Sequence, residues 1–301
     1  MNVMTAGDLK ATDLSALDSK ALMKLEAEIA QRFMGGVPWG SVTWALTNLA
    51  VWLSLWPLTI LGIVPIWVAF PIACLNVMLS YLPSHEAQHD IIARPGEPLR
   101  WLNQLVGTVS TIPLVGPYRV LKMTHMEHHK HCNDPDLDPD IHNKAESSLD
   151  FLRKSITRRF RLGGGGDVGY AAAIERIGGP EAALAQRDAL VLQLTYLAVL
   201  FITAWNGHAI EAALLWWLPR HVAQTYIGFY LSWAPHHPSI ETGRYRDTRA
   251  FKSALGNIGS MGMQFHIIHH LYPRIPLMRT PAAYWALRPI LEARGCDLER
   301  L

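Results

Sequence analysis

Two long apolar stretches, each broken once by a turn, dominate the pattern of the chain. Residues 42–82 contain no Asp, Glu, Lys, Arg or His over 41 consecutive positions. As a single helix this stretch would extend about 60 Å, roughly twice the ~30 Å hydrocarbon core of a bilayer. Gly62 and Pro65 supply a turn in its middle. The pattern therefore predicts two antiparallel membrane-spanning helices, at about 42–60 and 65–82.

A second pair of spans is predicted farther along the chain. Residues 189–205 are uncharged, and after a short Asn-Gly-His turn residues 209–233 return across the bilayer. Pro180 allows the first of these helices to begin early, because proline favours the first helical turn. Arg220 lies near the middle of the returning span, where it either snorkels or pairs with Glu211. We assign it a structural role.

Two further segments are apolar without being long enough to cross a membrane. Residues 101–118 are interrupted by Gly and Pro, which predicts an embedded half-helix or re-entrant piece. Residues 18–34 place their apolar side chains on one helical stripe, which predicts an interfacial or core-packing helix within an N-terminal segment, residues 1–40. Residues 41–301 then form one membrane domain. The predicted fold is all-α, with four spans in two hairpins.

Composition supports a membrane protein. Half of the 301 residues are apolar and 17% are charged, below the quarter that is usual for soluble domains. The net charge of +2 provides no overall field for nucleic acid. All Lys and Arg residues except Arg220 lie outside the predicted spans and on one side of them. The positive-inside rule makes that side cytoplasmic, and we expect an integral protein of a bacterial inner membrane.

Cysteines and histidines differ sharply in their distribution. Three cysteines are widely spaced and predict neither a disulfide framework nor a thiolate metal site. Most of the 14 histidines fall in four short clusters at the cytoplasmic ends of the spans. Positions i, i+3 and i+4 of a helix share a face, whereas adjacent residues diverge by about 100°, so one HxxHH box can serve two metals. The clusters are His85 and His89; His125, His128, His129 and His131; His236 and His237; and His266, His269 and His270.

The first cluster alone has another interpretation. His85-Glu86-x-x-His89 matches a zinc metalloprotease, in which the glutamate is the base. Such a site takes one further ligand and leaves the other clusters without a role, so we reject it. A carboxylate-rich di-iron site needs two Glu-x-x-His pairs, and only Glu86 and His89 fit. HxxxH and two HxxHH boxes together supply eight imidazoles, which suits two ions of iron or, by ligand type, copper or zinc.

The three boxes, their order and the two hairpins resemble the membrane fatty acid desaturase and hydroxylase superfamily over about residues 80–290. Within it, HMEHHKHCNDPDLDPD, WAPHHP and FHIIHHLYPRIP look most similar to carotenoid ring hydroxylases and ketolases. Two features depart from the pattern of those enzymes. The first box has Glu86 where a different acid is expected, and the glycine-rich piece 162–180 is longer than usual. The resemblance implies a cytoplasmic helical cap that holds two iron ions through histidine.

The resemblance also implies roles for individual residues. One further ligand is expected before the third box, for which His236 is preferred and His237 is the alternate. The implied iron ligands are His85, His89, His125, His128, His129, His236, His266, His269 and His270. Several acids are candidates to accept hydrogen bonds from these imidazoles, although the run of Asp and Pro is equally typical of turns and helix caps; they are Glu86, Glu127, Asp134, Asp136, Asp138 and Asp140.

The implied activity is dioxygen-dependent oxidation of a long apolar lipid by a di-iron oxidoreductase. We expect hydroxylation of a carotenoid β-ring, with acyl-lipid fatty acid desaturation as the alternative. A histidine-rich lipid-binding or metal-transport protein is the non-enzymatic option. No fused electron-carrier motif is found, so a separate donor such as ferredoxin is expected. The basic run 153–161, with Arg158 and Arg159, is a candidate docking site for that donor or for anionic lipid headgroups.

Overall fold

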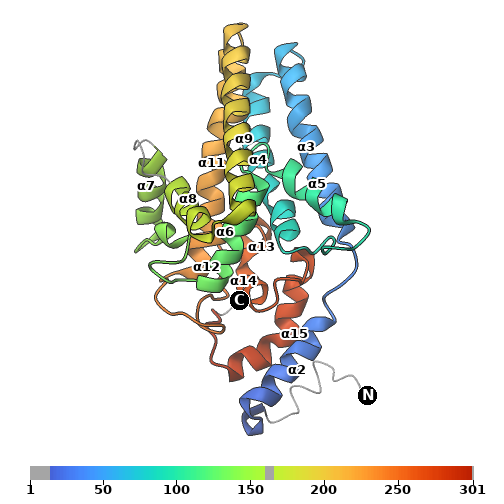
Figure 1. The fold of residues 1–301 in the computed structure, drawn as a ribbon, viewed down its shortest axis with the longest axis vertical. Helices are drawn as coiled ribbons and strands as arrows, with labels where there is room; N and C mark the ends of the chain where they lie inside the picture. The colour runs from blue at the N-terminus through green and yellow to red at the C-terminus, as the bar shows by residue number, and fades with distance from the viewer. Residues whose placement is uncertain (1–13, 160–165, 300–301) are drawn as a thin grey trace.

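The structure is a computed structural model that describes residues 14–159 and 166–299. Over these residues the chain is all-α, as predicted, and its β-structure is limited to one isolated parallel bridge between Ala250 and Leu298. Long helices stand side by side as a tall bundle, and the shorter helices gather around its lower half (Figure 1).

Four long helical stretches form the tall bundle, at the four positions predicted for spans. The first three are α3 (Trp39–Ile60), α4 (Ile66–Gln88) and α9 (Gly179–Trp205), which has Pro180 in its first turn. The fourth is a continuous stretch in which two π-helical segments alternate with α-helix. It consists of α10 (Ala209–Ala212), η3 (Ala213–Trp217), α11 (Leu218–Ile227), η4 (Gly228–Trp233) and α12 (Ala234–His236).

Two of these helices, α4 and α9, are long and apolar enough to cross a membrane, judged by length and composition over the described residues. Only 6% of the apolar window of α9 is buried inside the protein, so α9 is not the core helix of a soluble fold. Its exposed side chains are large and apolar, and include Leu190, Leu194, Leu197 and Phe201. The arrangement of four spans stays a prediction.

The segment between the two pairs of long helices is embedded among them. After α5 (Arg100–Ser110), residues 111–117 are irregular, and Leu114 and Val115 are buried against α3, α4, α9 and η3. Backbone carbonyls without helical partners need donors in an apolar environment. Trp216 Nε1 donates to the Pro113 carbonyl (2.9 Å), and Arg220 Nε donates to the Leu114 carbonyl (3.0 Å).

Arg220 therefore has the structural role that the sequence predicts, but with different partners. Besides the Leu114 carbonyl, its guanidinium lies over the Tyr196 ring, 5.4 Å from the centroid. Glu211, the predicted partner, instead faces His208, with 3.5 Å between a carboxylate oxygen and the imidazole Nδ1. The arginine ties the irregular segment to α9 and α11.

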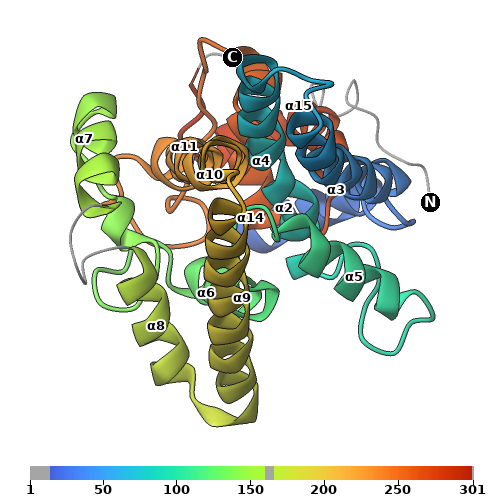
Figure 2. The same ribbon diagram turned by 90° about the horizontal axis from the view of Figure 1, so that it is seen from above.

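The shorter helices form a cap at the lower end of the bundle. α6 (Tyr118–His131) packs against α4 and α9, α7 (Ser148–Arg159) against α11, and α8 (Gly166–Ile177) against α9. Viewed from above, α7 and α8 lie on one side of the bundle and α5 on the other (Figure 2). Short helices complete the cap: η2 (Ile141–Asn143), α13 (Gly256–Gly259), η5 (Met263–Phe265), α14 (His266–Leu271) and η6 (Leu277–Arg279).

The predicted N-terminal helix packs into the core of the cap. After η1 (Leu14–Ala16), α2 (Ser19–Gln31) begins where the Asp18 carboxylate accepts a hydrogen bond from the Ala21 amide (2.7 Å), which satisfies an otherwise free donor. Its apolar stripe lies against α15 (Thr280–Ala293), at the bottom of Figure 1. Of the two predicted alternatives, the core-packing helix is therefore the one observed.

Candidate metal centre

The first histidine pair lies at the lower end of α4. His85 is in the last turn of the helix and His89 caps it, so the i,i+4 spacing brings the ring centroids within 5.3 Å. The helix ends here because Asp90 adopts a left-handed backbone conformation (φ 54°). The Asp90 carboxylate forms ion pairs with Arg100 of α5 and Lys122 of α6, which fix the end of α4 against both helices.

The second box lies on α6, and its histidines point to two different sides of the helix, as expected for adjacent residues. His125 and His129 share the face toward the first box: His125 Nε2 is 2.8 Å from His89 Nε2 and 3.1 Å from His129 Nε2. His128 points elsewhere, with its Nδ1 2.9 Å from the Asp138 carboxylate. α6 thereby supplies imidazoles both to the side of the first box and to the side of Asp138.

The third box, on α14, and the His236–His237 pair both lie beside the second box. In α14, His269 faces the first two boxes, with its Nε2 3.0 Å from that of His129. His236, at the end of α12, has its ring centroid 4.8 Å from that of His128. His237 instead lies against the Trp233 ring, at 4.9 Å between centroids. The structure thus places His236, the preferred residue of the pair, in the cluster.

The imidazoles gather into two groups, the arrangement expected for two ions. Within each group the potential ligand atoms all lie within 4.8 Å of one another. His129 and His266 join the groups, since both rings lie within 5.3 Å of rings in each. One group is His85, His89, His125 and His269, and the other is His128, Cys132, His236 and His270. All nine predicted ligands therefore lie in one cluster.

The cluster fits metal ions better than it fits a hydrogen-bond network. Facing Nε2 atoms at 2.8–3.1 Å leave several imidazoles without a complementary acceptor or donor. Burial and neighbouring imidazoles lower the pKa of most of the rings, which favours the neutral form that binds metal; they are His89, His125, His129, His236, His266, His269 and His270. His128 is the exception, because the Asp138 carboxylate outweighs burial and raises the pKa of its imidazole to about 9. Buried Nε2 atoms without any hydrogen-bond partner belong to His85, His236, His266 and His270. Imidazole shells of this kind suit iron, copper or zinc.

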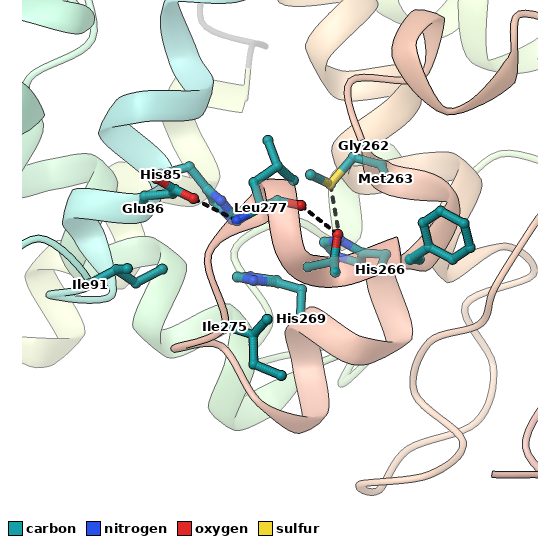
Figure 3. Close-up of a pocket in the computed structure, with 11 residues that line it drawn as sticks. His85, Glu86, Ile91, Gly262, Met263, His266, His269, Ile275 and Leu277 are labelled. Atoms are coloured by element: carbon teal, nitrogen blue, oxygen red, sulfur yellow. Dashed lines mark hydrogen bonds between the residues drawn. The ribbon is translucent and has the colours of Figure 1, made fainter. Parts of the chain in front are cut away.

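The carboxylate that supports a predicted ligand is Asp138. Its Oδ1 lies 2.9 Å from His128 Nδ1, and its Oδ2 accepts a hydrogen bond from the Asn133 amide (2.8 Å). Such a partner orients a ligating imidazole and fixes its tautomer. Glu86, another predicted acid, accepts a hydrogen bond from the Leu277 amide (2.6 Å) rather than from an imidazole (Figure 3).

The remaining predicted acids do not hydrogen-bond to the cluster. Asp140 accepts from the Tyr170 hydroxyl (2.8 Å), and Glu127 faces cationic side chains at 3.6–3.8 Å. Asp136 is exposed, and its amide donates to the Asp134 carboxylate (2.9 Å) in a turn. For Asp134 and Asp136 the structure favours turn formation, the other interpretation of the Asp-Pro run.

Two residues near His236 were missed by the sequence analysis. The Asp247 carbonyl accepts from His236 Nδ1 (2.9 Å) and from the Cys132 thiol (3.4 Å). Burial raises the pKa of the Cys132 thiol, so it acts as a donor rather than as a thiolate. In the sequence, a lone cysteine without a CxxC partner does not indicate a role at this site. Asp247 could not be found either, because it reaches His236 through an irregular segment with no fixed spacing.

A small and a large cavity border the cluster. The small one has a volume of about 10 Å³, room for about one water molecule, and lies between Glu86, His85 and His266 (Figure 3). The large one has a volume of about 900 Å³ and borders imidazoles from the first, second and third boxes. Apolar side chains from α8, α11 and η4 line it, among them Ile174, Ile227 and Leu231. An elongated apolar molecule in this cavity would lie directly against the imidazoles.

Comparisons with known proteins agree with this geometry. A family model described as fatty acid desaturase matches residues 50–297. The sn-1 oleoyl-lipid 12-desaturase of Anabaena variabilis is 24% identical, over 84% of this chain and 64% of its own. The sn-1 acyl-lipid omega-3 desaturase (ferredoxin) of Nostoc sp. (strain 36) is 23% identical, over 75% and 69%. The fatty acid conjugase FAC2 B of Calendula officinalis is 25% identical, over 70% and 64%. The chain thus spans slightly less than two thirds of the length of two of these relatives.

Proposed function

The chain belongs to the fatty acid desaturase family, and from this premise we propose that it introduces a double bond into the acyl chain of a membrane lipid. The names of the relatives above refer to acyl lipids and fatty acids, which supports the alternative expected from the sequence over hydroxylation of a carotenoid β-ring. The observation that carries the proposal is the cavity of about 900 Å³ that runs along apolar walls to the imidazole cluster.

Two iron ions bound by the nine histidines would supply the power to oxidise an unactivated C–H bond with dioxygen. In the overall reaction, –CH2–CH2– becomes –CH=CH–, while one dioxygen, two electrons and two protons yield two water molecules. The chain's own residues position the substrate, since His85, His125, His128 and His266 border the cavity. The apolar walls hold an extended acyl chain against this face and exclude bulk water.

The position of the chain in the membrane and the source of its electrons follow from the same proposal. The exposed apolar surface of α9 favours contact with lipid. The four long helices favour an arrangement of two membrane hairpins, with the histidines at their lower ends on the cytoplasmic side. The reaction takes up two electrons, for which we propose a separate donor protein. The ferredoxin named for the Nostoc relative supports a donor of that type.

Expression in a β-carotene-producing host, beside a His128→Ala control, tests the activity. New unsaturated acyl chains that disappear in the control would support desaturation. Hydroxylated or keto carotenoids without new unsaturation would overturn it in favour of carotenoid ring oxidation. An unchanged fatty-acid and pigment profile, in cells where the purified protein contains iron and a ferredoxin is supplied, would contradict both.

A further inference from the structure

The wall of the large cavity continues onto the exposed apolar surface of α9. Leu190 of α9 lines the cavity and is 60% exposed, and Val168 of α8, which also lines it, is exposed as well. Leu190 follows the charged residues Arg187 and Asp188 and begins the exposed apolar surface of α9. The cavity therefore reaches the outside of the bundle where α9 changes from charged to apolar residues, the level expected for the boundary between headgroups and hydrocarbon.

Four helices surround this part of the cavity. α9 packs against α10 near the turn that joins them and against α6 and α8 elsewhere, while α11 packs against α4 and α7. Residues of α9 and α11 line the cavity, as do residues of α7 and α8. Viewed from above, α7 and α8 lie to the same side of α9 and α11 (Figure 2). The cavity thus lies between α9 and α11, with α7 and α8 on its outer side.

One exposed face of α7 is an apolar stripe. Leu149, Leu152 and Ile156 follow the spacing of three and four that places side chains on one side of a helix, and they are 75%, 41% and 52% exposed. A different side of the helix contains Phe151 and Ser155, which are buried and line the cavity. An exposed apolar stripe on a helix that is already packed on another side is typical of a helix in a membrane interface.

The charge of α7 favours the surface of a membrane as the partner of this stripe. The 12 residues of α7 include four cations and one acid, Asp150, which pairs with Arg153 (3.4 Å) and Lys154 (2.8 Å). The excess positive charge suits anionic headgroups, and the stripe suits acyl chains. An acidic electron donor would use the charge but leave the stripe in water. Of the two partners expected for the basic run 153–161, whose last two residues lie outside the described residues, lipid is therefore favoured.

On the other side of the bundle, α5 shows a similar arrangement. Trp101 and Leu105, one helical turn apart, are both exposed. α5 and α7 lie at about the same height along the bundle (Figure 1), and tryptophan is enriched at membrane interfaces. Two helices with exposed apolar side chains thus mark one level of the bundle from opposite sides.

Building on the proposed desaturation, we propose that the large cavity opens sideways into the cytoplasmic leaflet of the bilayer, between α9 and α11, and that α7 lies in the interface beside this opening. A membrane lipid then passes an acyl chain from the leaflet toward the imidazoles without exposing it to water. The exposed apolar side chains around the opening face lipid, which avoids the unfavourable free energy of contact with water.

Photo-crosslinking in nanodiscs tests the opening without turnover. The whole, iron-loaded chain is placed in equal parts of phosphatidylcholine and phosphatidylglycerol, with a tracer phosphatidylcholine that carries a diazirine at the end of one acyl chain. The sample is irradiated in the absence of dioxygen and reductant. Peptide mass spectrometry should find lipid attached to cavity residues of η4, such as Leu231, as well as to the outer surface of α9. Labelling of α9 without labelling of the cavity would overturn the sideways opening.

Two variants of α9 locate the entrance. Leu190→Trp adds bulk at the residue shared by the cavity wall and the exposed surface, and it should reduce labelling of the cavity severalfold. Leu194→Trp adds similar bulk one turn farther along the exposed surface of α9 and should leave labelling of the cavity unchanged. Equal labelling of the cavity in both variants would place the entrance elsewhere. Labelling of the outer surface of α9 in the same samples reports whether each variant is folded and inserted.

A photo-crosslinking residue on α7 tests the position of this helix. Placed at Leu152, within the stripe, it should attach to lipid severalfold more than at Thr157, which is exposed on the side of Asp150 and Lys154. Crosslinks from Leu152 to a second copy of the chain, or lipid crosslinks no stronger than those from Thr157, would overturn the interfacial position. Because no oxidation is measured, failure of either experiment would leave the proposed desaturation open to its own test.

Discussion

His236 and His237 are neighbours in the sequence with different surroundings in the fold. His236 is 5% exposed and its Nε2 lacks a partner, whereas His237 lies against the Trp233 ring. We expect purified His236→Ala to lose iron, because one of the two groups is left with two imidazoles and a thiol. His237→Ala should retain the iron content of the parent protein. Equal losses in both variants, measured by elemental analysis, would contradict the assignment.

Asp138 and Asp136 form a matched pair for the support of the second box. Asp138 is buried against His128, and Asp136 is exposed. Asp138→Asn should lower iron affinity or turnover about 10- to 100-fold, since the acceptor that orients the imidazole is weakened. Competition with a chelator measures the affinity, and Asp136→Asn serves as the control. An Asp138→Asn protein that holds iron as tightly as its control would refute this role.

At the scale of residues, helical spacing made the candidate ligands predictable, because residues one turn apart on a helix must share a face. The three boxes lie on α4, α6 and α14, and the nine histidines meet in one cluster. The supporting groups were less predictable. Asp138 could not be separated from its neighbours in an Asp-Pro run, and Cys132 and Asp247 meet His236 only through the tertiary fold.

The contact between Gly107 of α5 and Tyr118 at the start of α6 shows how elements hold the first box. A Cβ at Gly107 would overlap the Tyr118 ring, and the Tyr118 hydroxyl donates to the Ala87 carbonyl between His85 and His89 (2.8 Å). Gly107→Ala should therefore destabilise the protein by about 1–3 kcal/mol and reduce its iron content.

Thermal unfolding in detergent and elemental analysis of the same samples measure both effects. Thr108→Ala, an exposed substitution on the same helix, is the control. A Gly107→Ala protein with the stability and iron content of this control would show that the close approach is unimportant.

At the scale of elements, the apolar stretches predicted where the long helices lie. The early start of α9 at Gly179 agrees with the prediction from Pro180. The continuation of α4 to Gln88 was less predictable, because it runs through polar residues that the cap buries. The π-helical segments η3 and η4 were not predicted, since an extra residue per turn leaves no mark in composition. An embedded piece at 101–118 was expected, but not the Trp216 and Arg220 donors that satisfy the carbonyls of its irregular part.

For the whole molecule, Glu26 connects the N-terminal helix to the cap. This fully buried carboxylate of α2 accepts hydrogen bonds from Tyr272 (2.7 Å) and Tyr245 (3.1 Å), and pairs with Arg244 and Arg294 at 3.4–3.5 Å. Glu26→Gln should cost about 3–5 kcal/mol, because two cations lose their counter-charge.

The thermal unfolding temperature of Glu26→Gln should therefore fall well below that of Glu28→Gln, which alters an exposed glutamate on the same helix. Equal unfolding temperatures would show that α2 contributes little to the cap. The sequence predicted this helix and its apolar stripe, but a buried acid with partners more than 200 residues away could not be inferred from spacing.

The proposed function depends on two metal ions held by histidines drawn from four distant segments of the chain. Iron measured per polypeptide in purified, catalytically active protein tests this most directly. We predict about two iron ions per chain, with fewer in His128→Ala. Active protein that contains no iron, or one ion or fewer per chain, would contradict the account.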